Sequence, residues 1–214
     1  MKEHLMAKSP DDVGAFYDPK YKAAGLEAFT SPERHVMVAL LIRYGANLQT
    51  GSCALDACCG SGEFLAALPQ GVEMFGFDVS THATELAQFR LRPMVADIRR
   101  LALENLMVSD FAGKRFDVVT CFGAIEHTMH PLSSFITLIS FLKPGGTLLV
   151  TVPLEFDGCL DAIRAEENQV TNERFAGVQE WLDLFSRNGK IRLQHEIVGD
   201  GERKDLAIIY RKEN

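Results

Sequence analysis

No stretch of this sequence is hydrophobic for long enough to cross a bilayer. The longest apolar runs cover residues 36–42 and 135–142, whereas a membrane-spanning helix needs about 20 apolar residues. The first ten residues, MKEHLMAKSP, also lack the apolar core of a signal peptide. Cysteine is scarce as well: the chain has five, and none forms a C-x-x-C pair. These absences favour a cytoplasmic protein with reduced thiols over a secreted, disulfide-stapled one.

An excess of positive charge is also absent. Lysine and arginine number 22 against 29 aspartates and glutamates, so the formal net charge is −7. Proteins that bind duplex nucleic acid usually carry a basic footprint, and an anionic membrane surface attracts basic segments. We therefore expect no nucleic-acid or membrane partner. A small or cationic substrate, or a protein partner, fits this net negative charge better.

Repeats, low-complexity stretches and Pro/Ser-rich linkers are lacking too. The 214 residues are 47% hydrophobic and 24% charged, close to the average of soluble globular proteins. Residues 1–30 show little periodicity, and Ser31-Pro32 has the composition of a helix start. We expect one domain overall, with an N-terminal cap segment over residues 1–50 and the main domain over residues 51–214.

From residue 53 onward, short apolar runs alternate with helical stretches. The runs lack strict alternation, which is typical of parallel strands that are buried on both faces. Phe135, Leu138, Ile139 and Leu142 share one face of a helix that a Pro-Gly-Gly breaker ends. Alternating strands and helices predict an α/β fold with a doubly wound parallel sheet. The expected strands are residues 53–55, 74–77, 94–96, 116–121 and 147–152.

The last forty residues depart from this rhythm. Residues 172–188 have the apolar spacing of a helix, and Gly189 follows as its stop. Two strands are expected at residues 191–197 and 206–210, joined by the turn at residues 199–202. The otherwise parallel sheet is therefore predicted to end with an antiparallel pair.

The strongest chemical signal is a glycine turn that follows the first expected strand. The strand ends in Asp56, and Gly60-Ser61-Gly62 then opens a helix. Glycine at such a turn lets a ligand approach the backbone closely. By itself a Gly-x-Gly turn is weak evidence, because many ordinary strand-to-helix connections contain one.

Two further acidic residues strengthen the signal. Asp78 ends the second expected strand and Asp97 the third. The carboxyl ends of strands are where open α/β sheets bind ligands, and a carboxylate there can accept hydrogen bonds from ribose hydroxyls. Together with the glycine turn, the three carboxylates predict a nucleoside site.

The type of nucleoside follows from what the turn lacks. A dinucleotide fingerprint would have a third glycine at position 65, which is Leu65. A phosphate loop would continue with Lys and Ser or Thr, but Glu63 follows Gly62. An acidic residue just before the turn suits a ligand with a positive group and no phosphate. S-adenosylmethionine, with its ammonium and sulfonium, is such a ligand.

The chain resembles class I S-adenosylmethionine-dependent methyltransferases, in particular the small-molecule branch with the ubiquinone- and menaquinone-biosynthesis enzymes. The resemblance covers about residues 53–152 and rests on five motifs: LDACCGSGEF, FGFDVS, VADIRR, FDVVTCFGAIEH and LKPGGTLLVTVP. It implies a Rossmann-like methyltransferase fold: a mostly parallel seven-stranded sheet with an antiparallel last strand, and an N-terminal helical cap. The main domain would then be the catalytic domain. One departure is Cys58, where the family often has glycine.

The resemblance also implies residue roles toward S-adenosylmethionine. Asp56 and the Gly60 turn would hold the methionine end, and Asp78 the ribose. Asp97 and Ile98 would face the adenine. Aromatic residues of the N-terminal segment, Tyr17 and Tyr21, would close over the cofactor, or else pack as surface residues. The full expected cofactor set is Tyr21, Asp56, Ala57, Cys58, Gly60, Gly62, Asp78, Val79, Asp97, Ile98, Cys121 and Phe122.

Glu126-His127 follows the fourth expected strand, where the family has a matching pair between cofactor and acceptor. His127 is the candidate catalytic residue, because a neutral imidazole can take a proton from the acceptor. The alternative is that it positions the cofactor. His127 and His130 form H-x-x-H, but no further ligand cluster is recognisable, so we expect no metal.

Two other functions compete with a small-molecule methyltransferase. One is a nicotinamide-dependent oxidoreductase on a similar sheet, against which Leu65 and Asp56 argue. The other is a non-catalytic protein that only binds S-adenosylmethionine. Neither the acceptor nor the atom that receives the methyl group can be identified from the sequence.

Overall fold

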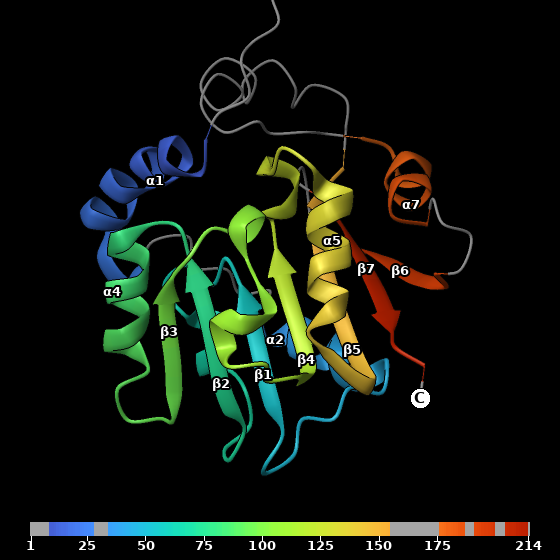
Figure 1. Ribbon diagram of the computed structural model, residues 1–214, viewed down its shortest axis with the longest axis horizontal. Helices are drawn as coiled ribbons and strands as arrows, with labels where there is room; N and C mark the ends of the chain where they lie inside the picture. Colours follow the sequence, from blue (N-terminus) through green and yellow to red (C-terminus); the bar gives the residue numbers. More distant parts are fainter. Residues whose placement is uncertain (1–8, 28–33, 155–175, 187–190, 200–203, 214) are drawn as a thin grey trace, which may run out of the picture.

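The protein is described here by a computed structural model that covers residues 9–27, 34–154, 176–186, 191–199 and 204–213. These residues form a seven-stranded sheet with helices on both faces (Figure 1). The strand order is β3-β2-β1-β4-β5-β7-β6. The strands are β1 (Cys53–Ala57), β2 (Glu73–Asp78), β3 (Ala96–Arg100), β4 (Phe116–Phe122), β5 (Leu142–Pro153), β6 (Leu193–Val198) and β7 (Asp205–Arg211).

The strand directions confirm the predicted fold class. Strands β1 to β5 pair in parallel, and β7 runs antiparallel to both β5 and β6. Because β6 opposes β7, it points the same way as β5, and β7 alone is reversed in the sheet. The expected antiparallel pair of strands is therefore present, with β7 inserted beside β5, whereas most of the turn expected at residues 199–202 lies outside the described residues.

Helices cover the two faces of the sheet. The α-helices are α1 (Pro10–Ala24), α2 (Arg34–Arg43), α3 (Glu63–Ala66), α4 (Thr81–Arg90), α5 (Pro131–Ser140) and α7 (Val178–Ser186). Four short 3-10 helices are η1 (Gly25–Glu27), η2 (Leu103–Asn105), η3 (Val108–Phe111) and η4 (Ile125–His127).

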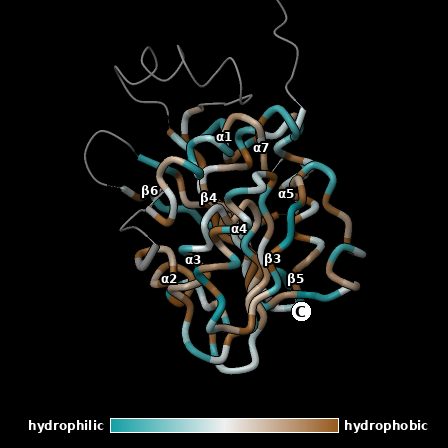
Figure 2. The backbone as a smooth tube through the Cα atoms, turned by 90° about the vertical axis from the view of Figure 1, so that its left-hand side faces the viewer, coloured by the Kyte–Doolittle hydropathy of each residue, from teal (hydrophilic) through white to brown (hydrophobic). Residues whose placement is uncertain are grey.

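Two apolar clusters separate these layers. One cluster joins α5, α7, η2 and η3 to the sheet, and the other joins α2, α3 and α4 to its opposite face. Figure 2 shows the hydrophobic segments gathered along the sheet between the helices. Burial on both faces explains why the strands read as continuous apolar runs.

Several element boundaries differ from the sequence-based expectation. The third strand begins at Ala96, after the exposed Met94 and Val95, and continues to Arg100. The Pro-Gly-Gly cluster expected to precede the fifth strand lies inside β5, where the pairing with β4 shifts register near Phe116. Ser31-Pro32, the expected helix start, lies outside the described residues, and the helix that follows is described from Arg34 onward. Of the helix expected at residues 172–188, α7 lies within the described residues.

The N-terminal segment contains a regular helix that periodicity did not reveal. Ser9 caps α1: its hydroxyl accepts from the Asp12 backbone N–H, and the Asp12 carboxylate accepts from the Ser9 N–H. Pro10 occupies the first helical turn, where its missing N–H costs nothing. In Figure 1, α1 lies beside α4, above the edge to which β2, β3 and β4 point. The boundary between cap and main domain at residue 50 stays a prediction.

Candidate functional site

The turn after β1 has a backbone shape that favours glycine. Gly60 and Gly62 have φ values of +52° and +76°, and Cys58 has +57°. A side chain at Gly60 would place its Cβ 2.7 Å from the Tyr21 hydroxyl, so this glycine also allows a close approach. At Cys58 a non-glycine residue adopts the left-handed conformation, which costs about 1–2 kcal/mol. This is the position where the family often has glycine.

Asp56 is buried next to the end of β1. The residue is 3% exposed. The Thr120 hydroxyl of β4 donates a hydrogen bond to its Oδ1 at 2.7 Å. Asp56 and Thr120 face each other in the parallel register of β1 and β4. The neighbouring strand therefore fixes the carboxylate at the edge of the sheet.

Asp78 ends β2 and is tied to two backbone groups. The N–H of Gly60 donates to Oδ2 at 3.0 Å, and the N–H of Ser80 donates to Oδ1 at 2.9 Å. Burial raises the pKa of Asp78 to about 6, although these two hydrogen bonds favour the charged form. The glycine turn and the second carboxylate thus form one hydrogen-bonded unit.

Helix α1 covers this unit and reaches three loops. Tyr21, which is buried, places its hydroxyl against Gly60. Gly14 lies against Val79, since a Cβ there would be 3.1 Å from the Val79 carbonyl oxygen. The Tyr17 hydroxyl is 3.5 Å from Nε2 of His127. Helix α1 therefore contacts the three segments that follow β1, β2 and β4.

His127 lies in η4, just past β4, and only 12% of its side chain is exposed. Its Nε2 is 4.0 Å from Oε1 of Glu126, whose residue is 1% exposed. The ring of Tyr17 meets the imidazole edge-on, with centroids 6.2 Å apart. The imidazole thus lies between a buried carboxylate and a phenol, an arrangement in which it can hold or pass a proton.

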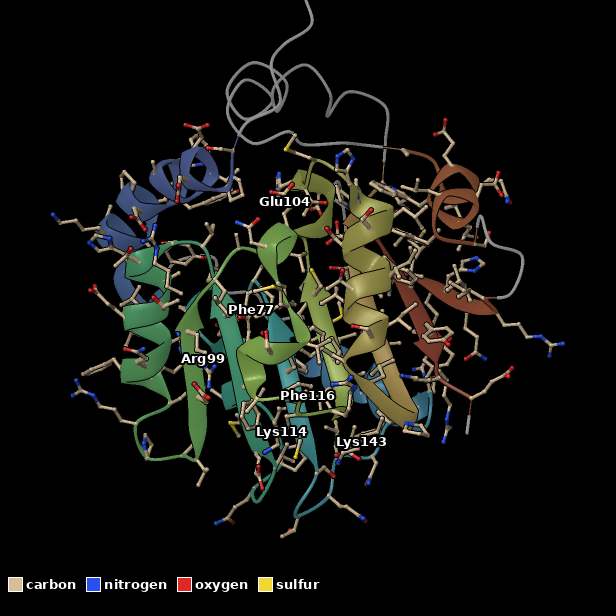
Figure 3. The ribbon with its side chains drawn as sticks, in the orientation of Figure 1. Phe77, Arg99, Glu104, Lys114, Phe116 and Lys143 are labelled. Carbon is tan, nitrogen blue, oxygen red and sulfur yellow. The ribbon has the colours of Figure 1, made fainter. Side chains whose placement is uncertain are left out.

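Asp97 and Ile98 are not brought to this site. Asp97 does not end β3 but lies three residues before Arg100, the last residue of the strand. It pairs with Phe75 of β2, whereas Arg100 pairs with Asp78. Its carboxylate accepts hydrogen bonds from Arg99, labelled in Figure 3. Ile98 is buried in the apolar cluster with α3 and α4. The expectation that Asp97 ends the third strand is wrong, because the exposed residues before Ala96 were counted as strand.

The remaining predicted residues surround the end of β4. Cys121 is fully buried and pairs in register with Ala57, which is also fully buried. A hydrogen bond with Cys121 and burial raise the pKa of the Cys58 thiol well above its usual value. Phe122 packs edge-on against Phe64 of α3, with centroids 5.0 Å apart. These cysteines therefore pack as thiols, and Phe122 supports the helix that the glycine turn opens.

Two site contacts were missed by the sequence reasoning. Glu104 of η2, labelled in Figure 3, accepts a hydrogen bond from the backbone N–H of Met129 and so joins the segments after β3 and β4. Asp18 of α1 accepts hydrogen bonds from the Ser80 hydroxyl and, at 3.3 Å, from the His82 N–H. The capping pattern at Ser9 and Asp12 could have revealed α1. No local pattern points to either contact.

Charged pairs at the opposite edge of the sheet belong to the scaffold. Lys114 binds Glu73 at 2.6 Å and Lys143 binds Asp117 at 2.7 Å, and both lysines lie toward the lower edge in Figure 3. Among the described residues, no group of three or more histidine, cysteine or acidic side chains could hold a metal ion. Within the same part of the chain, no helix is long and apolar enough to span a membrane.

Comparison with known sequences identifies a family. The profile of the family described as "Methyltransferase domain" matches residues 29–196. A ubiquinone biosynthesis O-methyltransferase from Alkalilimnicola ehrlichii is 29% identical over 150 residues, which cover 69% of this chain and 58% of that protein. A demethylmenaquinone methyltransferase from Geobacillus stearothermophilus is 25% identical over 158 residues, covering 72% and 64%. The chain thus spans less than two thirds of the length of these relatives.

Comparison with solved structures supports the fold. Magnesium protoporphyrin IX methyltransferase from Synechocystis PCC 6803, solved with bound SAH, superposes with a TM-score of 0.71 at 15% identity. The superposition covers 94% of this chain and 98% of that one.

Proposed function

This chain belongs to the methyltransferase domain family, and we propose that it transfers the methyl group of S-adenosylmethionine to a small-molecule acceptor. The observation that carries the proposal is the connected unit of Asp56, the Gly60 turn and Asp78 at the carboxyl edge of the sheet. That edge is where open α/β sheets bind nucleosides. The motifs that form this unit are those on which the family resemblance rests.

The residues at this edge fit S-adenosylmethionine. Asp78 retains acceptor capacity, because a carboxylate has about four lone-pair sites and two of them receive the N–H groups of Gly60 and Ser80. It can accept from the ribose hydroxyls. Asp56 offers a buried negative charge that would offset the positive methionine end. The bare backbone at Gly60 lets the Tyr21 hydroxyl lie against the turn, so Tyr21 stands beside the backbone that the ligand would meet.

The family resemblance assigns Asp97 and Ile98 to the adenine. The roles proposed for Asp97 and Ile98 require a different register of β3 from the one described, in which Asp97 binds Arg99. Val79, at the end of β2, remains a candidate contact. Its carbonyl oxygen already accepts from Arg100 Nε at 3.1 Å.

The cofactor supplies an electrophilic methyl group and a neutral leaving group when it is bound. The protein's part is to align the acceptor with that methyl group and to exclude water, and positioning can contribute several kcal/mol, of order 7–11 in ideal cases. We propose that His127 takes the acceptor's proton on its Nε2, with Tyr17 beside it. If the acceptor ionises readily, no base is needed and His127 would position the cofactor instead.

The two competing functions are less well supported. A nicotinamide-dependent oxidoreductase needs a third glycine where this chain has Leu65. A protein that only binds S-adenosylmethionine would have no need for His127 at the edge beside Tyr17. We also propose a cytoplasmic location, because Cys53, Cys58, Cys59 and Cys121 are all free thiols. The acidic balance argues against a nucleic-acid acceptor.

Ligand-dependent stability and turnover test the proposal together. S-adenosylhomocysteine at a hundredfold excess over its dissociation constant should stabilise the fold by about 2.7 kcal/mol. For a chain of this size that raises the melting temperature by roughly 5–10 °C. NAD should leave the melting temperature unchanged. Release of S-adenosylhomocysteine from S-adenosylmethionine, measured with a panel of small phenols and quinols, then separates an enzyme from a binding protein.

A further inference from the structure

Asp18 of α1 makes a contact that bridges distant parts of the chain. It lies 62 residues before Ser80, and its Oδ1 accepts from the Ser80 hydroxyl. The same oxygen accepts from the His82 N–H at 3.3 Å, and the imidazole of His82 lies 3.7 Å away. The carboxylate therefore sits at the N-terminus of α4, where the helix dipole favours negative charge.

Ser80 links Asp18 to Asp78 by hydrogen bonds. The residue is fully buried, and its backbone N–H donates to Asp78 Oδ1 at 2.9 Å. Its hydroxyl oxygen also accepts from the Ala83 N–H at 3.1 Å and so caps α4. One serine thus connects the α1 carboxylate, the α4 terminus and the proposed ribose-binding carboxylate.

The electrostatics of Asp18 agree with a persistent contact. Partial burial by itself would raise the pKa of Asp18, yet the hydrogen bonds from Ser80 and His82 bring it below the ordinary value. The carboxylate is thus charged at neutral pH. A charged acceptor that receives two hydrogen bonds is more strongly held than a neutral one.

Asp18 lies close on α1 to two tyrosines that contact the site. Tyr17 precedes it and reaches His127, and Tyr21 lies one turn later against the Gly60 turn. Fixing Asp18 on α4 therefore also fixes both tyrosines over the site.

We propose that Asp18 is a positioning residue that orients Asp78 for the cofactor ribose through Ser80. The inference rests on the proposed function, since it assigns Asp78 to the ribose. It adds a residue that acts on the cofactor without touching it.

Calorimetric binding of S-adenosylhomocysteine to the full chain tests the inference. Asp18→Ala should weaken binding about tenfold, because the loop that carries Asp78 loses a charged partner. Asp18→Asn keeps an acceptor oxygen at the same place and should restore most of the affinity. Asp11→Ala is the matched control: Asp11 lies on the same helix and carries the same charge, but its side chain is 92% exposed and makes a solvent-exposed ion pair with Arg100 at 3.7 Å, which contributes little.

Combination with Asp78→Ala separates positioning from general destabilisation. If Asp18 acts through Asp78, Asp18→Ala should cause little further loss of affinity in the Asp78→Ala background. Multiplied losses in the double variant would overturn the inference. So would unchanged affinity in Asp18→Ala, or equal losses in Asp11→Ala.

A second variant keeps the test decisive if Asp18→Ala does not fold. Ser80→Ala removes the hydroxyl at the other end of the contact and should also weaken binding about tenfold; unchanged affinity would overturn the inference. Failure of the wild-type protein to bind S-adenosylhomocysteine would instead contradict the proposed function, so the two failures are distinguishable.

Discussion

The backbone N–H of Gly60 donates a hydrogen bond to the Asp78 carboxylate at 3.0 Å. This contact joins the turn after β1 to the end of β2, two segments that carry the two most specific parts of the sequence signal. A ligand that spans both segments would meet a site whose parts are already held together. Preorganisation of this kind lowers the cost of ordering the site on binding.

Removal of the Asp78 carboxylate tests the ribose assignment. Asp78→Ala should weaken S-adenosylhomocysteine binding by about 1.5–3 kcal/mol, because buried ribose hydroxyls lose a charged acceptor. Calorimetry measures the change. Glu73→Ala is the control: it removes a carboxylate at the opposite end of the same strand, where it binds Lys114, and should leave the affinity unchanged. Equal affinities in wild type and Asp78→Ala would remove the residue from the ribose site.

The raised pKa of Asp78 predicts opposite pH trends for stability and for binding. Its pKa is about 6 in the folded chain against 3.8 for the free group. The folded state thus binds the proton more tightly, and stability falls by about 3 kcal/mol as pH rises from well below 3.8 to well above 6. Ribose hydroxyls donate to the charged form, so cofactor affinity should rise over the same interval.

Asp78→Asn provides the reference for this pH dependence. Chemical denaturation and calorimetry from pH 4.5 to 7.5 should show both trends in the wild type and neither in the variant. Parallel curves for the two proteins would show that another group titrates.

Replacing His127 by alanine distinguishes a general base from a residue that positions the cofactor. As a base it should contribute about 10²–10⁴ in kcat. His127→Ala should therefore slow turnover by that factor while S-adenosylhomocysteine affinity stays nearly intact. A fall in both quantities would indicate positioning. Full turnover on the acceptor would remove His127 from the catalytic residues.

Tyr17→Phe extends the test to the neighbouring phenol. The hydroxyl lies 3.5 Å from Nε2, so its loss should shift the pH optimum of turnover while cofactor affinity stays constant. Phe16→Leu, which changes the adjacent aromatic residue, should leave the pH optimum unchanged. A profile in Tyr17→Phe that matches the wild type would exclude the phenol from proton handling.

Cys58→Gly tests the strain in the glycine turn. Left-handed geometry costs a non-glycine residue about 1–2 kcal/mol, and the added entropy of glycine costs roughly 0.5–1 kcal/mol. The difference is about 0–1.5 kcal/mol, and loss of the Cys58 hydrogen bond with Cys121 reduces it, so we expect a net gain in unfolding free energy of less than about 1 kcal/mol. Ala112→Gly, at the other described non-glycine position with positive φ, should also gain. Cys59→Gly should lose stability, since Cys59 packs in the core.

Deletion of residues 1–24 tests the role of α1. The sheet begins at Cys53, so the fold should persist, whereas turnover should fall strongly because Tyr17 and Tyr21 no longer cover the site. In the full chain, amides of residues 17–21 should gain protection from hydrogen exchange when S-adenosylhomocysteine binds. Normal methylation by the truncated protein would show that α1 is not needed.

Local sequence patterns predicted the parts of the site that lie at strand ends and in the glycine turn. Asp56, Gly60 and Asp78 follow from these patterns, and the structure joins Gly60 to Asp78. The third strand was misplaced because an apolar run does not reveal register: Val95 is apolar, yet 78% exposed. Asp97 was consequently assigned to a strand end that lies three residues further on.

Helix α1 shows the other limit of sequence reasoning. Its buried side has few apolar residues, because polar contacts such as that of Asp18 with Ser80 fix it to the sheet domain. Periodicity reports apolar faces and cannot reveal a carboxylate whose partner lies 62 residues away. The cap at Ser9 was the one local signal.

A crystal structure with bound S-adenosylhomocysteine tests the central claim most directly. The account predicts ribose hydroxyls within hydrogen-bond distance of the Asp78 carboxylate and the homocysteine end against the Gly60 turn, beside Asp56. Ligand bound elsewhere on the protein, with the carboxyl edge of β1 and β2 left empty, would contradict it.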